Sequence, residues 1–193
     1  MAQCELKFNN NFELIVSVIL SAQCTDKRVV SITPKLFAKY PTAHDLARAD
    51  ISDVENIIKP CGFYHNKARN IIECSKDLDE KYGGVVPSDF DKLVSLKGVG
   101  RKTASVVLVV GFNEPAMPVD THVFRVSNRL GIGDPKSVVA CEKRLKENVP
   151  RSSWTNFHSR MVLFGRYNCK AIKPMCENCK LQDICLYHKS KLV

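Results

Sequence analysis

The sequence LKGVGRKTA occupies residues 96–104 and joins two segments with helical patterns. The first predicted helix ends at Leu96, and the second begins near Arg101. Between them, Gly98 and Gly100 allow positive φ angles and a close approach of the backbone to another molecule. The second helix points its first N–H groups and the positive end of its dipole at the turn. The turn is therefore suited to hold a phosphate group without recognising a base sequence.

Basic side chains surround this turn, because Lys97, Arg101 and Lys102 flank the two glycines. A helix–GVG–helix string with such neighbours is typical of helix-hairpin-helix DNA binding, and we place this motif at about residues 89–110. The expected DNA contacts are Gly98, Val99, Gly100 and Arg101. The alternative is a structural helix–turn–helix whose lysines face solvent.

Lys102 has two possible roles at this position. It can be another phosphate ligand, or it can be a nucleophile. An amine attacks carbon only when it is unprotonated, and a helix N-terminus together with Arg101 and Lys97 disfavours the cationic form. These surroundings suit a lysine that forms an imine.

Asp120 lies in the segment PVDTH, residues 118–122, directly before an apolar helix. Aspartate is a favoured N-cap residue, so a structural role explains this position. An N-cap aspartate can also face a cleft, where it accepts a proton from Lys102 or stabilises a cationic sugar. The residues alone leave both roles open.

Four cysteines lie close together near the C-terminus with the spacing C-x6-C-x2-C-x5-C. They are Cys169, Cys176, Cys179 and Cys185. Their thiolates can surround one tetrahedral zinc ion or one [4Fe–4S] cluster. Disulfides are a third option, which a reducing cytosol disfavours. The thiolate count favours zinc, but the single C-x2-C pair shifts weight toward a cluster, because short zinc sites usually pair two such clamps.

The first loop of this cysteine segment carries Lys170 and Lys173. A metal centre at both ends of the loop holds these lysines in fixed positions, which suits contact with DNA phosphates. The alternative is a structural metal staple with incidental lysines.

The charge distribution agrees with a polyanion partner. Residues 1–120 contain 15 basic and 15 acidic residues, whereas residues 121–193 contain 14 basic and 5 acidic residues. The whole net charge of +9 therefore lies in the last third, where it forms a binding face or a solvated basic surface. The five other cysteines are scattered among apolar neighbours and fit core positions. We expect neither a secretion signal nor a membrane span.

The hydrophobic pattern predicts an all-α fold with short connections and a metal-stapled tail. Capping-box starts are expected at Thr42 and Ser52, and helix stops at Gly83 and Gly131. The run Val106–Val110 is compatible with a strand, but we interpret it as helix because it continues the segment that follows Lys102. Further helices are expected after Asn11, over 64–81, from Ser88 to Leu96, over 120–130, from Ser137 to Pro150 and from Ser153 to Tyr167.

Three motifs in this order carry a resemblance to a known family: LKGVGRKTA at 96–104, VDTHVFR at 119–125 and the cysteine tail. Together they resemble the endonuclease III branch of the helix-hairpin-helix glycosylase superfamily. SAQCTD at 21–26 and GFYHNKA at 62–68 resemble further segments of that family.

The resemblance implies a two-domain, all-α helix-hairpin-helix DNA glycosylase fold. Residues 1–114 would form a six-helix barrel domain that contains the hairpin, and residues 115–193 an iron–sulfur cluster domain. DNA would bind between the two. The family has a further N-terminal helix, which we expect to be missing here. The metal implied is a [4Fe–4S] cluster on Cys169, Cys176, Cys179 and Cys185, which replaces the zinc expectation.

The resemblance also implies residue roles. Lys102 would attack the sugar C1′ and Asp120 would be its acidic partner. Gln23 would fill the gap left by a flipped nucleotide, and Phe63 would act as a wedge in the base stack. The activity implied is a bifunctional glycosylase and AP lyase that removes oxidised pyrimidines and cleaves the strand by β-elimination.

The expected partner is double-stranded DNA that contains an oxidised pyrimidine or an abasic site. We expect a monomer in the prokaryotic cytoplasm, associated with the nucleoid and not with a membrane. One competing hypothesis is a mismatch- or adenine-type monofunctional glycosylase, which Lys102 disfavours because such enzymes typically lack it. The other is a non-catalytic DNA-binding module with a structural metal.

Overall fold

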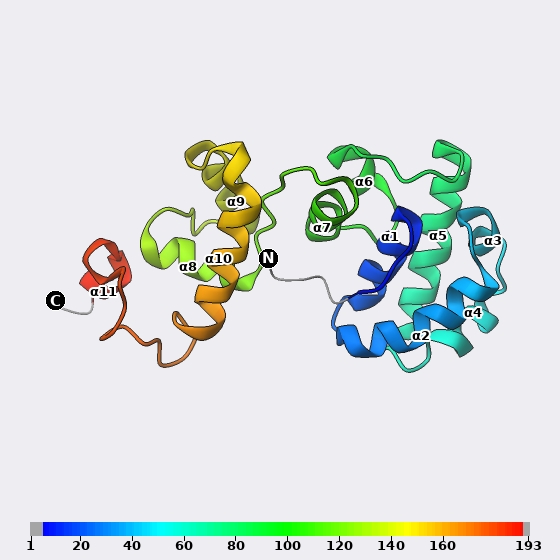
Figure 1. Ribbon diagram of the computed structural model, residues 1–193, viewed down its shortest axis with the longest axis horizontal. Helices are drawn as coiled ribbons and strands as arrows, with labels where there is room; N and C mark the ends of the chain where they lie inside the picture. The colour runs from blue at the N-terminus through cyan, green and yellow to red at the C-terminus, as the bar shows by residue number, and fades with distance from the viewer. Residues whose placement is uncertain (1–5, 191–193) are drawn as a thin grey trace. The chain divides into compact units, whose positions relative to one another are not determined.

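The structure is a computed structural model that describes residues 6–190. Within this range every regular element is a helix, which confirms the all-α expectation. The chain divides into two compact units, one that ends at Glu114 and one that begins at Pro115 (Figure 1). Between residues 6 and 190 no helix is both long enough and apolar enough to cross a membrane.

The first unit contains the helices before Pro115. They are α1 (Asn11–Ser21), α2 (Asp26–Lys39), α3 (Ala43–Ala47), α4 (Ile51–Ile58), α5 (Tyr64–Tyr82), α6 (Phe90–Ser95) and α7 (Arg101–Phe112). Helix α1 packs against α2, α5 and α7, and α5 packs against α3 and α4.

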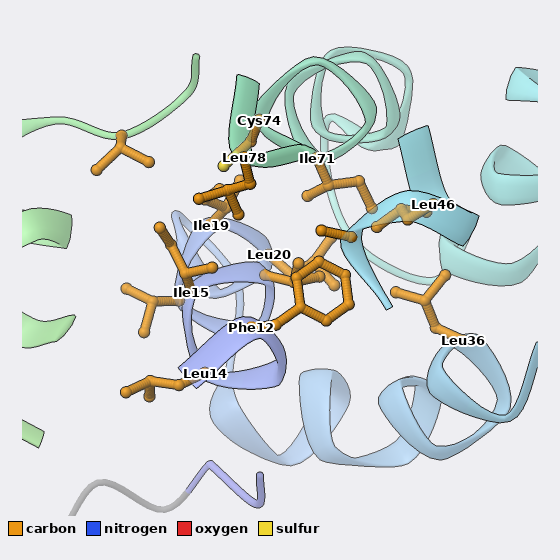
Figure 2. Packing of buried hydrophobic residues seen from close by; sticks show 14 of the residues in the cluster. Phe12, Leu14, Ile15, Ile19, Leu20, Leu36, Leu46, Ile71, Cys74 and Leu78 are labelled. Atoms are coloured by element: carbon orange, nitrogen blue, oxygen red, sulfur yellow. The ribbon is translucent and has the colours of Figure 1, made fainter. Parts of the chain in front are cut away.

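Helix α1 is the centre of this unit, because every residue from Phe12 to Leu20 is buried. A helix that is mostly apolar and buried on all sides is stable only when other helices surround it. Figure 2 shows Ile15, Ile19 and Leu20 of α1 packed among side chains of the helices around it, such as Leu46 and Ile71. The first unit therefore has one hydrophobic core built around α1.

Local sequence signals explain most helix ends. Thr42 and Asp45 form the expected capping box, with each side chain bonded to the other's backbone N–H. Gly83 ends α5 in the left-handed conformation, as its lack of a Cβ atom allows. Two predicted starts are wrong: Asp50, not Ser52, caps α4, and Asp89, not Ser88, caps α6. In both cases an aspartate close by accepts the orphan N–H groups instead.

The second unit contains the helices after Pro115. They are α8 (Thr121–Leu130), α9 (Val138–Asn148), η1 (Arg151–Ser153), α10 (Trp154–Tyr167), η2 (Gln182–Ile184) and α11 (Leu186–Lys189). Helix α8 packs against α9, α10 and α11. The core consists of Met117, Val119, Val123, Val126, Cys141, Leu145, Met161 and Val162. It is smaller than the core of the first unit and leaves the cysteine tail at its edge.

Candidate active site and metal centre

Helices α6 and α7 form the predicted hairpin, joined by residues 96–100. Leu96 and Val99 are buried and anchor the turn in the core, whereas Gly98 and Gly100 are exposed. Gly100 occupies the N-cap position of α7 and has no side chain to bond the first N–H groups of the helix. The N-terminus of α7 is therefore open to an anionic group.

Helix α5 contacts the turn through Asp77 and Asn70. The Lys97 N–H donates to Asp77 Oδ2 at 3.2 Å. Gly98 has φ +76°, and a Cβ atom there would lie 2.8 Å from the Cβ of Asn70. Both the backbone angle and the contact with α5 require glycine at this position.

Replacement of Gly98 by alanine is expected to destabilise the protein by about 1–3 kcal/mol, because the new Cβ meets Asn70 and disfavours the positive φ. The decrease in the midpoint of thermal unfolding measures this effect. An unchanged midpoint would show that the turn has another conformation.

Gly100→Ser is the matched variant on the same turn. Gly100 has an ordinary φ of −85°, and no atom lies within 4 Å of its missing Cβ. Serine is a favoured N-cap, so we expect stability to be maintained. The serine hydroxyl competes for the N–H groups of α7, however, and DNA affinity should fall. Equal affinity for DNA would remove the turn from the binding surface.

Lys102 lies in the first turn of α7, and its side chain is exposed. Its neighbour Arg101 places its guanidinium carbon 4.8 Å from the centre of the Phe90 ring, so the hairpin helices α6 and α7 are joined by a cation–π contact. Lys102, the candidate nucleophile, therefore lies at the open N-terminus of α7, and the Arg101–Phe90 contact joins this helix to α6.

Asp120 is the N-cap of α8 in the second unit, as its position before an apolar helix predicts. Its Oδ1 accepts hydrogen bonds from the N–H groups of His122 at 2.9 Å and Val123 at 2.8 Å. Both bonds use the same oxygen, so Oδ2 accepts none within the described part of the chain. Capping therefore fixes the carboxylate without using its second oxygen.

Gln23 and Phe63 lie on two neighbouring turns of the first unit. The Gln23 carbonyl oxygen is 3.9 Å from the place of a Cβ atom on Gly62. Gln23 and Phe63 both have a positive φ, at 52° and 58°, although neither is glycine. The Phe63 side chain is 67% exposed. An exposed aromatic ring on a strained turn indicates a functional surface and not a core position.

Cys61 precedes Gly62 and is buried in the core, as predicted. It is 1% exposed, and burial, together with a hydrogen bond to Cys24, raises the pKa of its thiol to about 11. It is therefore a protonated thiol at neutral pH. Cys74 and Cys141 are also buried in the cores.

The four tail cysteines line one cavity of the second unit. All four are free thiols in the structure, and Leu130, Phe164, Pro174 and Met175 also line the cavity. Within residues 6–190 no three His, Cys, Asp or Glu side chains lie close enough together to hold one metal ion. Four thiolates are the donor set of a structural zinc ion or of an iron–sulfur cluster, so the residues that line the cavity have the chemistry to hold either group.

Two arginines of α8 hold the cysteine loop. Arg125 ends the motif VDTHVFR, but the sequence predicted no role for either arginine. Arg125 donates to the carbonyl oxygens of Cys169 at 3.1 Å and Gly165 at 2.8 Å. Arg129 donates to the carbonyl oxygens of Lys170 at 2.7 Å and Ala171 at 3.1 Å. The only signal was their spacing of four residues, which places both on one face of the helix.

The loop lysines are presented to solvent. Lys170 and Lys173 are both exposed, and Lys173 has a positive φ of 50°. Because the arginines hold the backbone of the loop, these lysines project from a defined position. This arrangement suits contact with a polyanion.

A comparison with protein families matches residues 16–151 to the HhH-GPD superfamily base excision DNA repair proteins. This match spans more than half of the chain and includes the hairpin, Lys102 and Asp120. The chain therefore belongs to the HhH-GPD superfamily.

Within this superfamily the chain is similar to endonuclease III. It is 51% identical to endonuclease III of Bacillus subtilis over 185 residues, which cover 95% of this chain and 84% of the relative. A trapped endonuclease III–DNA covalent intermediate matches with a TM-score of 0.86 and 48% identity, over 100% of this chain and 91% of that chain. A thermostable thymine-DNA glycosylase matches with a TM-score of 0.80 but only 26% identity, over 95% of this chain and 86% of that chain.

These relatives confirm the expected fold and the expected class of enzyme. The chain is a base excision repair DNA glycosylase and AP lyase with the helix-hairpin-helix glycosylase fold. The identity to endonuclease III is much higher than the identity to the thymine-DNA glycosylase. The likeness to endonuclease III supports the combined glycosylase and lyase class and excludes the purely DNA-binding alternative.

Proposed function

We propose that this enzyme removes oxidised pyrimidines from duplex DNA and cleaves the strand through an imine on Lys102. The observation that carries the proposal is the position of Lys102, an exposed amine in the first turn of α7 beside the open N-terminus of the hairpin. The similar structure described as a trapped covalent intermediate supports a mechanism with a protein–DNA bond.

The reaction begins when the damaged nucleotide leaves the base stack. Phe63 acts as the wedge and Gln23 fills the gap, because both lie on adjacent strained turns. Gly98, Val99, Gly100 and Arg101 hold the backbone of the strand. The amine of Lys102 then attacks C1′, and the base departs with the electron pair of its bond to C1′ and takes up a proton. The nitrogen loses a proton, the C1′–O4′ bond opens with a proton taken up by O4′, and the imine forms. Loss of the C2′ proton from the imine then expels the 3′ phosphate, which breaks the strand on the 3′ side of the lesion.

Asp120 supports the first step. Its carboxylate stabilises the positive charge that develops on the sugar, or it accepts the proton that the amine of Lys102 releases. The free Oδ2 is available for this role because Oδ1 alone caps α8.

Asp120→Asn separates the charge of this residue from its capping. Asparagine is as good an N-cap as aspartate, so stability should stay within about 0.5 kcal/mol. Without the carboxylate, base excision should slow by about 10²–10⁴-fold. β-Elimination on DNA that already contains an abasic site should slow less. If both reactions slowed equally, Asp120 would act on a step that they share.

We propose that the second unit is the cluster domain and the first unit the barrel domain. Cys169, Cys176, Cys179 and Cys185 would hold a [4Fe–4S] cluster, since their thiols line one cavity. When bound, the cluster supplies structural cross-links and no step of the excision chemistry. The residues around it orient the loop that carries Lys170 and Lys173.

The loss of Lys173 tests the DNA-binding role of this loop. For Lys173→Ala, the slope of log affinity against log salt concentration should decrease by about 0.9, the value for one lost phosphate contact. Lys76→Ala is the control, because Lys76 is paired with Glu73 on α5. Binding titrations at several salt concentrations give both slopes. If Lys173→Ala and Lys76→Ala both kept the wild-type slope, Lys173 would be a surface charge that makes no phosphate contact.

The expected partner is therefore duplex DNA with an oxidised pyrimidine or an abasic site, bound by a monomer in a prokaryotic cytoplasm at the nucleoid. The excess of basic residues after residue 120 supports binding to a polyanion.

Borohydride trapping tests the proposed function. Incubation of the wild-type enzyme with abasic-site duplex and sodium borohydride should give a covalent protein–DNA adduct that survives denaturing electrophoresis. Duplexes with oxidised pyrimidines should give the same adduct, while undamaged duplex should give none. A wild-type enzyme that releases the damaged base without forming an adduct would be a monofunctional glycosylase.

A further inference from the structure

Arg129 contacts a cysteine sulfur and an aromatic ring in addition to the carbonyl oxygens of the loop. It lies in the last turn of α8, and its Nη1 donates to the Cys169 Sγ at 3.4 Å as well as to the Lys170 carbonyl. Its guanidinium carbon also lies 4.4 Å from the centre of the Tyr187 ring in α11. A single side chain thus joins the first cysteine, its loop and the C-terminal helix.

The contact with sulfur distinguishes Arg129 from Arg125. Arg125 lies one turn earlier on α8 and donates to the carbonyl oxygens of Cys169 and Gly165. Within residues 6–190 it donates to no sulfur. Both arginines place one positive charge near the cysteine segment. Of the two arginines, only Arg129 directs an N–H group at a sulfur that would bind iron. Within residues 6–190 the backbone N–H of Leu181 also donates to a proposed ligand, the Cys179 Sγ, at 3.4 Å, and neither arginine variant removes this contact.

A donor that points at a thiolate has a defined effect on an iron–sulfur centre. Hydrogen bonds to the cysteine sulfurs set the reduction potential of such a centre. The donor stabilises negative charge on the sulfur, and the reduced centre has one more electron than the oxidised one. The guanidinium remains protonated in proteins, so the donor is permanent. Such a contact therefore favours the reduced state.

We propose that Arg129 is a positioning residue that raises the reduction potential of the cluster through the sulfur of Cys169. This proposal rests on the proposed [4Fe–4S] cluster. The stacked Tyr187 ring and the two loop carbonyls hold the planar guanidinium in the orientation that reaches the sulfur. The residue therefore links the electronic state of the metal centre to the loop that presents Lys170 and Lys173.

The experiment compares Arg129→Met with Arg125→Met as cluster-loaded proteins, by voltammetry of the purified enzyme. Both variants remove one cation from the same face of α8, but only the first removes a donor to sulfur. The potential should shift to more negative values in Arg129→Met and stay near the wild-type value in Arg125→Met. Equal shifts in both variants would indicate a general charge effect and overturn the proposal, as would an unchanged potential in Arg129→Met.

Iron and sulfide analysis separates this inference from the proposed function. A wild-type protein without iron and sulfide would refute the cluster, and the role of Arg129 would be refuted with it. If Arg129→Met fails to retain its cluster, Arg129→Lys replaces it. Lysine keeps the charge but lacks the fork that reaches sulfur and carbonyl together. A smaller shift in the same direction is then expected, and a wild-type potential would contradict the proposal.

Discussion

Lys102→Ala is expected to abolish the borohydride-trapped adduct and to slow strand cleavage by at least about 10³-fold, because no other group replaces a lost nucleophile. The fold should be unaffected. Lys102 is exposed, and a cation in the first turn of a helix opposes the helix dipole. The unfolding free energy should therefore change by less than about 0.5 kcal/mol. Gel analysis of reduced reactions and a thermal melt measure the two effects.

Lys97→Ala provides the matched control for this variant. Lys97 is an exposed lysine on the same turn, and its backbone N–H, not its side chain, bonds to Asp77. Its loss should weaken DNA binding but leave the adduct intact at saturating enzyme. If Lys97→Ala lost the adduct as completely as Lys102→Ala, the phosphate contacts of the turn, and not one amine, would explain both results.

Cys179→Ser should have the largest effect on stability. The segment from Cys169 to Cys185 has few apolar contacts of its own: Ile172 is 81% exposed and Ile184 is 65% exposed. Its only regular element is the short 3-10 helix η2. A segment of this kind depends on its metal for folding. Loss of one proposed ligand should therefore remove the brown colour that a bound [4Fe–4S] cluster would give and destabilise the second unit by about 4 kcal/mol or more.

Cys74→Ala is the control for the loss of a cysteine. Cys74 is fully buried in the core of the first unit, where burial raises the pKa of its thiol to about 12. Its replacement leaves a cavity in the core but removes no proposed cluster ligand. The variant should therefore be less stable, yet its visible absorption and iron content should equal those of the wild type. Visible absorption and iron analysis of the two variants distinguish a ligand from a buried thiol. A colourless wild type with bound zinc would contradict the cluster assignment.

Much of the fold could be predicted from the sequence, because helix caps and stops depend on residues that are close together in the chain. The capping box of Thr42, the N-cap of Asp120 and the glycine stop at Gly83 depend on residues within a few positions of one another. The segment Val106–Val110 is helical as predicted, since it continues the helix that begins at Arg101. Such features follow from local hydrogen bonds and backbone angles.

Helix α2 was not predicted, because Pro34 lies inside it and removes one backbone hydrogen bond, at a usual cost of about 3 kcal/mol. Its buried positions Val29, Ile32, Thr33 and Leu36 nevertheless follow helical spacing. Packing of this face against the core of the first unit stabilises the helix despite the proline.

The contacts of Arg129 could not be predicted either. This side chain reaches Cys169, Lys170 and Ala171, which lie about 40 residues further along the chain. No local pattern encodes such a contact, because it depends on how the tail folds against α8. The cysteine spacing predicted a centre, but the residues that support it required the structure.

Peptide mapping of the reduced adduct is the most direct measurement of the central claim. The enzyme is trapped on abasic-site duplex with borohydride, digested with nuclease and protease, and analysed by mass spectrometry. The sugar-derived mass should be found on the peptide that contains Lys102, and on its side-chain nitrogen. Attachment to another lysine, or to the N-terminal amine, with Lys102 unmodified would contradict the account.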